Sequence, residues 1–347
     1  MNQNTVLVTG GSGFFGGILK RRLLDAECRV VNIDLQPDDL QHPGLTSIQG
    51  DIRDQALMSR IYSETRFDAV YHCAAMLAHE VRDRDTLWTS NVDGTRIVAE
   101  GARQSGVSNL VFTSSNCLWG KGYDYALAEH ERPAPVEIYG SSKWVGERVL
   151  REYSADMNIV TLRCPTILDF GRLGLLSILF EFINEGRRVW TVGGGHNRYQ
   201  FIYAQDLADA CIAAAEHPRS NLFHIGSDGV KSMREIYQHV IERAGTGAKV
   251  SALPKEATLM AMRIAHHLRI SPLGPYHYKM IAENFLFDTT KIKAELAWKP
   301  TLTNEEMLYR AYLYYDQNRR EIEVRKDASA HRQAADMGVI RILKWLS

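Results

Sequence analysis

Apolar and polar positions alternate with two different periods along the first half of the chain. Short runs rich in β-branched residues predict buried strands, and the stretches between them, with apolar residues near i, i+3 and i+4, predict helices. The predicted strands are residues 5–9, 29–34, 47–50, 69–73, 109–114 and 159–164. The predicted helices are residues 16–26, 55–64, 88–105 and 141–156. This alternation is typical of βαβ units, so we predict an α/β fold with a doubly wound parallel sheet.

The pattern is less regular after Pro165. It predicts further helices, two short strands and a partly helical segment rich in Met, His and Pro: residues 175–185, 206–216, 232–244, 189–192, 222–225 and 251–287. We expect a cofactor-binding domain over residues 1–165, to which the chain can return within residues 186–225. A smaller mixed lobe over residues 166–316 would mainly bind substrate, and residues 317–347 would form a C-terminal helical tail.

Charge and composition exclude several classes of protein. The 347 residues contain 41 Lys and Arg and 41 Asp and Glu, so the formal net charge is zero and we expect no nucleic-acid partner. No apolar stretch approaches the roughly 20 residues that a membrane span needs. The first predicted strand starts too near Met1 for a cleaved signal peptide, so we expect none.

The cysteines and histidines predict no metal site. The histidines have no third ligand at a suitable spacing, and the five cysteines are widely spaced without a CxxC motif. We expect reduced thiols in a cytoplasmic protein, with neither a disulfide framework nor zinc. The cysteines are Cys28, Cys73, Cys117, Cys164 and Cys211.

Between the first strand and the first helix lies a glycine-rich turn. Small residues there allow a tight turn and a close approach of the backbone to a pyrophosphate, whose charge is stabilised by the helix N-terminus. Because the strand, the glycines and the helix come in that order, we predict a Rossmann-type dinucleotide site rather than a flexible turn. The residues expected at the cofactor are Gly10, Gly13, Phe14, Phe15 and Gly16.

Acidic residues end the second strand and follow the third. Asp34 lies about 20 residues past the glycines, where a carboxylate accepts hydrogen bonds from a ribose 2′-hydroxyl and repels a 2′-phosphate. It therefore favours NAD over NADP, with a role in the following turn as the alternative. Asp51 and Ile52 follow the third strand, where a side chain could meet the adenine, although Asp51 could equally be the N-cap of the next helix.

The chemically most specific pattern is Tyr139-Gly140-Ser141-Ser142-Lys143. Residues four apart share one face of a helix. A nearby ammonium stabilises tyrosinate, which lowers the phenol pKa toward a value useful for proton transfer. Thr113, Ser114 and Ser115 form a cluster at the end of the predicted strand 109–114, and one of them can offer a hydroxyl to the oxygen at which the proton is transferred.

Together these motifs resemble the extended short-chain dehydrogenases/reductases, the superfamily of nucleotide-sugar epimerases, dehydratases and 3β-hydroxysteroid-type dehydrogenases. The resemblance runs from Thr5 to about Asp316 and includes the glycine turn, Cys73-Ala74-Ala75, Asn91-Val92-Asp93-Gly94-Thr95, Ser114-Ser115, Tyr139 to Lys143 and Arg163-Cys164-Pro165. It implies NAD as cofactor, with Tyr139 as catalytic acid/base, Lys143 as its tuner and ribose ligand, and Ser115 as partner of the substrate hydroxyl. It also implies that Ala74 and Ala75 line the cofactor, that Asn91 supports the site, and that Pro165 lies beside the nicotinamide.

Departures from the family pattern bear on the reaction. Sugar-nucleotide 4,6-dehydratases place an acidic pair where this chain has Asn116 and Cys117, so we expect no dehydratase activity. UDP-galactose 4-epimerase-like members carry Asn where this chain has Thr166, and an arginine that Arg198 matches only one residue out of phase. Asn116, Thr166 and Arg198 are the candidate substrate ligands.

A second expected arginine is absent from residues 273–279. Diphosphates favour bidentate arginines, and Arg263, Arg269 or Lys279 could replace it. The Met- and Leu-rich residues 253–273 resemble the apolar lobe of the steroid and lipid dehydrogenases, although core packing is the commoner role of such apolar residues.

Three functions follow, in order of preference. The first is an NAD-dependent nucleotide-sugar epimerase that oxidises a ring hydroxyl transiently. The second is an NAD-dependent dehydrogenase or reductase of a lipid-like or 3β-hydroxysteroid-like alcohol. The third is an NAD-sensing regulator, which would be expected to lose Tyr139 or Lys143.

The chain ends in an amphipathic segment, residues 337–346, where Arg341, Lys344 and Trp345 lie among apolar residues. Such a segment can lie on a membrane surface or pack on a partner subunit. A terminal helix docked on its own domain is the alternative. We also expect a homodimer.

Overall fold

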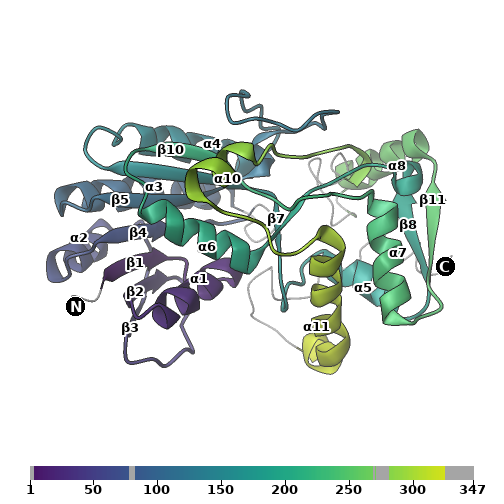
Figure 1. Ribbon diagram of the computed structural model, residues 1–347, viewed down its shortest axis with the longest axis horizontal. Helices are drawn as coiled ribbons and strands as arrows, with labels where there is room; N and C mark the ends of the chain where they lie inside the picture. Colours follow the sequence, from purple (N-terminus) through teal and green to yellow (C-terminus); the bar gives the residue numbers. More distant parts are fainter. Residues whose placement is uncertain (1–3, 78–82, 269, 271–280, 325–347) are drawn as a thin grey trace.

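The computed structural model describes residues 4–77, 83–268, 270 and 281–324. Arg269, Lys279 and the amphipathic segment 337–346 lie outside these residues. The chain builds a large sheet covered on both faces, with a smaller lobe at one end (Figure 1).

Within the described residues, seven parallel strands form the large sheet in the order β10-β6-β5-β4-β1-β2-β3. The strand order reverses beside β1, which is the place where such sheets bind ligands at their carboxyl ends. The predicted doubly wound parallel fold is confirmed. The strands are β1 (Thr5–Thr9), β2 (Arg29–Asp34), β3 (Leu45–Gln49), β4 (Ala69–His72), β5 (Asn109–Ser115), β6 (Asn158–Cys164) and β10 (Asn221–His224).

Apolar side chains on both faces of the strands bind this sheet between two layers of helices (Figure 1). In β1, Val6 and Val8 join the core under α1 and α6, whereas Leu7 joins the core under the other helices. This explains why the strands are continuous apolar runs. The helices are α1 (Phe14–Asp25) and α6 (Ala204–Ala215) on one face, and α2 (Gln55–Glu64), α3 (Arg84–Gln104) and α4 (Ile138–Arg151) on the other.

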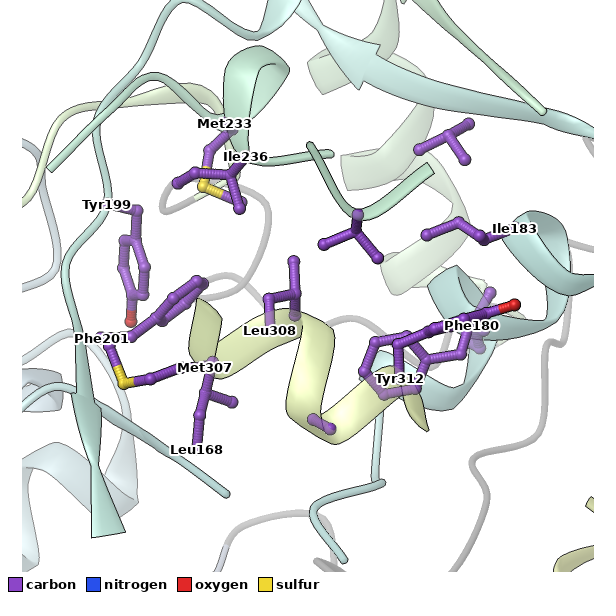
Figure 2. Packing of buried hydrophobic residues seen from close by; sticks show 14 of the residues in the cluster. Leu168, Phe180, Ile183, Tyr199, Phe201, Met233, Ile236, Met307, Leu308 and Tyr312 are labelled. Carbon is purple, nitrogen blue, oxygen red and sulfur yellow. The ribbon is translucent and has the colours of Figure 1, made fainter. Parts of the chain in front are cut away.

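The smaller lobe has its own apolar core, in which residues distant in sequence meet (Figure 2). Phe180 of α5 packs edge-on against Tyr312 of α11 at 5.9 Å between ring centroids, and Leu308 joins the same cluster. Two parallel strand pairs belong to this region, β7 with β9 and β8 with β11. The elements are α5 (Leu176–Asn184), α7 (Met233–Ala244), α8 (Lys255–His267), α11 (Asn304–Val324), β7 (Thr166–Leu168), β8 (Arg188–Val192), β9 (Phe201–Tyr203) and β11 (Lys249–Leu253).

The two regions are interleaved along the chain. After β9 the chain returns to the large sheet, where α6 packs beside α1 and β10 pairs with β6, with Asn221 opposite Val160. A short helix, α10 (Thr290–Leu296), also packs near β10 and α6. The division expected after residue 316 falls inside α11, where only Asn318 departs from helical backbone angles.

Candidate active site

The glycine turn is a close-packed backbone structure. Gly10 has a positive φ of 77°, and a Cβ atom built on it would lie 2.7 Å from the Cα of Ala74. A Cβ atom on Gly16 would lie 2.1 Å from the carbonyl oxygen of Gly10. Side chains at these positions would therefore distort the turn. A tight turn before a helix can present backbone N–H groups to a pyrophosphate. The turn fits a dinucleotide.

Phe14 and Phe15 contribute to this turn in a different way. Both side chains are buried and belong to the apolar core under α1. They anchor the first helical turn, so a contact of these residues with a cofactor falls to their backbone N–H groups.

Asp34 lies at the carboxyl end of β2 and contacts the glycine turn. Its carboxylate accepts hydrogen bonds from the N–H groups of Ser12 and Gln36, each at 2.9 Å. Asp34 therefore stabilises the turn that follows β2, which was the alternative role expected from the sequence. Each carboxylate oxygen keeps a second lone pair, so ribose hydroxyls can still be accepted.

Asp51 and Ile52 lie at the next strand end. Arg53 binds the Asp51 carboxylate through Nη2 at 2.6 Å and Nε at 2.9 Å, and holds its pKa below the usual range although burial opposes this shift. The N-cap of α2 is Asp54, which accepts from the N–H of Leu57 at 3.0 Å. The alternative that Asp51 caps this helix is therefore wrong. Ile52 is buried beside Gly94.

Tyr139 and Lys143 lie on the first turns of α4. Lys143 is 3% exposed, its Nζ lies 4.0 Å from the ring centroid of Phe112, and burial lowers its pKa to about 8. A Cβ atom on Gly140 would lie 2.1 Å from the carbonyl oxygen of Cys117. The start of α4 therefore packs directly against the 3₁₀ turn η1 (Asn116–Leu118) that follows Ser115.

Ser115 ends β5 opposite Cys164 of β6, so the buried Pro165 follows at the neighbouring strand end. The hydroxyl oxygen of Ser115 accepts from the N–H of Cys117 at 3.1 Å. Its own O–H can donate to a substrate oxygen.

Asn91 connects three elements around the site. Its Nδ2 donates to Ser142 Oγ and to the carbonyl of Met76, both at 3.0 Å, and its Oδ1 accepts from the N–H of Met76 at 2.7 Å. Ser142 Oγ in turn donates to the carbonyl of Tyr139 at 2.8 Å. Asn91 thereby joins α4 to the segment after β4, where Ala74 is half-buried and Ala75 is exposed.

His72 is a supporting residue that the sequence analysis missed. It is fully buried between Thr9 Oγ1 at 2.7 Å and Thr95 Oγ1 at 2.8 Å, and its ring lies against Phe112. Burial, with a smaller effect of the Lys143 charge, lowers its pKa to about 3. His72 is therefore neutral and links the end of β1 to α3; its place just before Cys73-Ala74 was the available signal.

A buried ion pair was also missed. Arg163 Nη2 of β6 lies 2.7 Å from Glu147 Oε2 of α4, and both side chains are at most 3% exposed. Ser114 Oγ donates to the same carboxylate at 2.5 Å. The pair fixes α4 to the sheet, and no local spacing could reveal it because its members come from different elements.

Of the three candidate substrate residues, Asn116 and Thr166 contact a common partner, whereas the hydrogen bonds of Arg198 to its neighbours involve its backbone. Asn116 Nδ2 donates to the hydroxyl of Tyr199 at 2.7 Å, and Thr166 Oγ1 lies 3.1 Å from the same hydroxyl. Tyr199 is 8% exposed at the margin of the lobe core (Figure 2), whereas Arg198 is exposed and joins residue 284 and Phe285 through its backbone. Tyr199 is not among the residues predicted from the sequence, although the shift of Arg198 by one residue was a signal at this position.

The described part of the chain has neither a candidate metal site nor a candidate membrane-spanning helix. No group of three or more His, Cys, Asp or Glu side chains there could hold a metal ion. No helix among those residues is both long and apolar enough to cross a membrane. All five cysteines are thiols.

Comparisons with known proteins agree with this geometry. Residues 6–226 match the NAD dependent epimerase/dehydratase family. The chain is 33% identical to the uncharacterized protein y4nG of Sinorhizobium fredii over 98% of its own length and 86% of the relative. It is 25% identical to a 3-beta-hydroxysteroid dehydrogenase of Mycolicibacterium neoaurum, covering 89% of this chain and 91% of the relative. The structure of a UDP-glucose 4-epimerase of Thermotoga maritima superposes with a TM-score of 0.74 at 22% identity, covering 90% and 99% of the two chains.

Proposed function

Because the chain belongs to the NAD dependent epimerase/dehydratase family and is an NAD-dependent enzyme, we propose that it is a nucleotide-sugar epimerase that oxidises a ring hydroxyl transiently. The observation that supports this most directly is the packing of Ser115 and the Tyr139–Lys143 helix at one edge of the sheet. The glycine turn lies at the same edge.

The residues at this edge divide the binding of NAD between them. The glycine turn would hold the pyrophosphate, Asp34 the adenosine ribose, and Lys143 the nicotinamide ribose. The remaining proposed cofactor neighbours are Asp51, Ile52, Ala74, Ala75, Asn91, Tyr139 and Pro165. When bound, NAD supplies a hydride acceptor that can return the hydride to the opposite face of the ring.

The protein side chains manage the proton. Ser115 donates a hydrogen bond to the substrate oxygen, and Tyr139 removes the hydroxyl proton as the carbon is oxidised. Lys143 stabilises the tyrosinate because its ammonium is held in a buried, weakly screened place. Tyr139 returns the proton when the ketone is reduced, so an epimerisation consumes no net acid or base.

A direct assay tests the proposal. The purified protein, supplied with NAD, is incubated with UDP-, GDP- and TDP-sugars, and the epimers are followed by proton NMR while NADH is followed by absorbance. We expect interconversion of one sugar pair without accumulation of NADH. The absence of binding of any nucleotide sugar at millimolar concentration would contradict the proposal.

A dehydrogenase of an apolar alcohol is the second candidate. The contact of the Tyr199 hydroxyl with the uncharged side chains of Asn116 and Thr166 favours it, since these are groups suited to an uncharged substrate. In the same assay this function would give stoichiometric NADH with a steroid-like alcohol and no epimerised sugar.

We further propose a cytoplasmic homodimer with a peripheral membrane contact through the amphipathic residues 337–346. The five thiols support the compartment. The exposed face of α8 supports the contact between subunits, because Met260, Ile264 and Leu268 are four residues apart and are 64%, 55% and 60% exposed. Sedimentation equilibrium tests the dimer, and co-sedimentation with anionic vesicles tests the membrane contact.

A further inference from the structure

The buried polar side chains of Lys20, Asn32 and Asp38 form a hydrogen-bonded network next to the glycine turn. Asp38, in the loop after β2, accepts hydrogen bonds on Oδ2 from Lys20 Nζ of α1, from Asn32 Nδ2 at 2.9 Å and from Ser47 Oγ at 2.8 Å. The side chains of Lys20 and Asp38 are only 3% and 6% exposed. Burial raises the pKa of the Asp38 carboxyl, but the hydrogen bonds from Lys20 and Ser47 outweigh it and keep the pKa below the usual range.

Asn32 connects this ion pair to the turn. Its Oδ1 accepts from the N–H of Gly11 at 2.9 Å, and its Nδ2 donates to Ser12 Oγ at 3.2 Å as well as to Asp38. A carboxylate only accepts hydrogen bonds, so Asp38 determines which end of the Asn32 amide faces Gly11. The contact is tight, since a Cβ atom on Gly11 would lie 2.3 Å from Asn32 Oδ1.

We propose that Lys20, Asp38 and Asn32 are positioning residues that hold the glycine turn in the conformation that binds the NAD pyrophosphate. Binding to a turn that is already ordered avoids the entropic cost of ordering it. The ion pair therefore raises cofactor affinity through Asn32. This inference concerns NAD binding alone and is independent of the substrate.

Variants of the described residues test this relay. Because removal of one partner would leave a buried charge, both are replaced together by apolar residues of similar size in K20M/D38L, a change that is often neutral for stability. Asn32→Ala removes the contact with the turn. The triple variant K20M/D38L/N32A completes the cycle. NAD affinity is measured by calorimetric titration of the apoprotein, and the amide exchange of the peptide containing Gly11 and Ser12 is measured without NAD.

We expect K20M/D38L and Asn32→Ala each to raise the Kd for NAD about tenfold and to accelerate exchange in the turn peptide. The triple variant should bind no more weakly than Asn32→Ala, because residues that act through one contact are not additive. The matched control is R22M/D209L, which removes an exposed ion pair between α1 and α6 and should leave the Kd within twofold. Unchanged affinity and exchange in a folded K20M/D38L would overturn the inference. So would losses that multiply in the triple variant.

Discussion

The proposed cofactor site and the proposed substrate wall, formed by Asn116, Thr166 and Tyr199, are built in different ways. At the glycine turn, residues close together in the sequence set the backbone shape through Gly10 and Gly16, and side chains such as Asn32 support it from the next strand. At the substrate wall, Asn116, Thr166 and Tyr199 come from η1, β7 and the segment before β9, and Asn116 is 83 residues from its partner. The proposed proton transfer and NAD binding, which are common to the family, therefore depend on local sequence motifs, whereas the proposed choice of substrate depends on tertiary contacts.

The largest expected effect is on the shared chemistry. Tyr139→Phe removes the proton-transfer group, so turnover should fall by roughly 10²–10⁴-fold while NAD affinity stays within twofold. Steady-state rates and NAD titration measure the two quantities. Tyr153→Phe, just after α4, is the control and should be active. A near-native rate for Tyr139→Phe would assign the proton transfer to another group.

The preference for NAD over NADP tests the proposed cofactor site, which depends on local sequence motifs. Asp34 should make NAD bind at least about tenfold more tightly than NADP, since its carboxylate repels a 2′-phosphate. Asp34→Ala should narrow this ratio, and Asp39→Ala, an exposed acid of the same loop, should not. Titration with both cofactors measures the ratio. Equal affinities in the unmodified protein would refute the role of Asp34.

These two predictions depend on features that the sequence could provide. The strands β1 to β6 and the glycine turn were predicted because each has a local pattern, and the family resemblance was confirmed. The three-residue strands β7 and β9 have no periodicity to detect. The relay through Asn32 and Asp38 and the contact of Tyr199 depend on pairs that meet only after folding.

The pH dependence tests whether Lys143 acts as a cation. Burial lowers its pKa to about 8, so the ammonium that stabilises tyrosinate is present below that pH and is lost above it. We expect kcat/KM to fall about tenfold per pH unit on the alkaline side. In Lys143→Arg, which keeps its charge, this fall should move to higher pH. A flat alkaline profile in the unmodified protein would exclude the cationic role.

A substitution of Tyr199 tests the proposed substrate wall, which depends on tertiary contacts. Tyr199→Phe removes the hydroxyl shared by Asn116 and Thr166, a loss of about 0.5–1.5 kcal/mol, so the KM for substrate should rise about two- to tenfold. The Kd for NAD should not change. Tyr309→Phe in α11, where the hydroxyl donates only a long hydrogen bond of 3.5 Å to the carbonyl of Arg243 near the surface, serves as control. A fall of NAD affinity together with substrate affinity would show that the cofactor site and the substrate wall are not independent.

The smallest expected effect concerns Arg198, and it separates the two candidate functions. Its side chain is exposed, so a contact with a substrate diphosphate would be screened by water and worth only about 0.2–1 kcal/mol. Arg198→Ala should then raise the KM for a nucleotide sugar by about 1.5- to fivefold at low salt, and the difference should disappear near 0.5 M salt because exposed charges are screened there. Steady-state kinetics at two ionic strengths measure this, with Arg188→Ala, an exposed arginine of β8, as control. An effect that persists at high salt would mean that Arg198 closes over the substrate. No effect at either salt concentration would favour an uncharged alcohol as the substrate, bound at the uncharged side chains of Asn116, Thr166 and Tyr199.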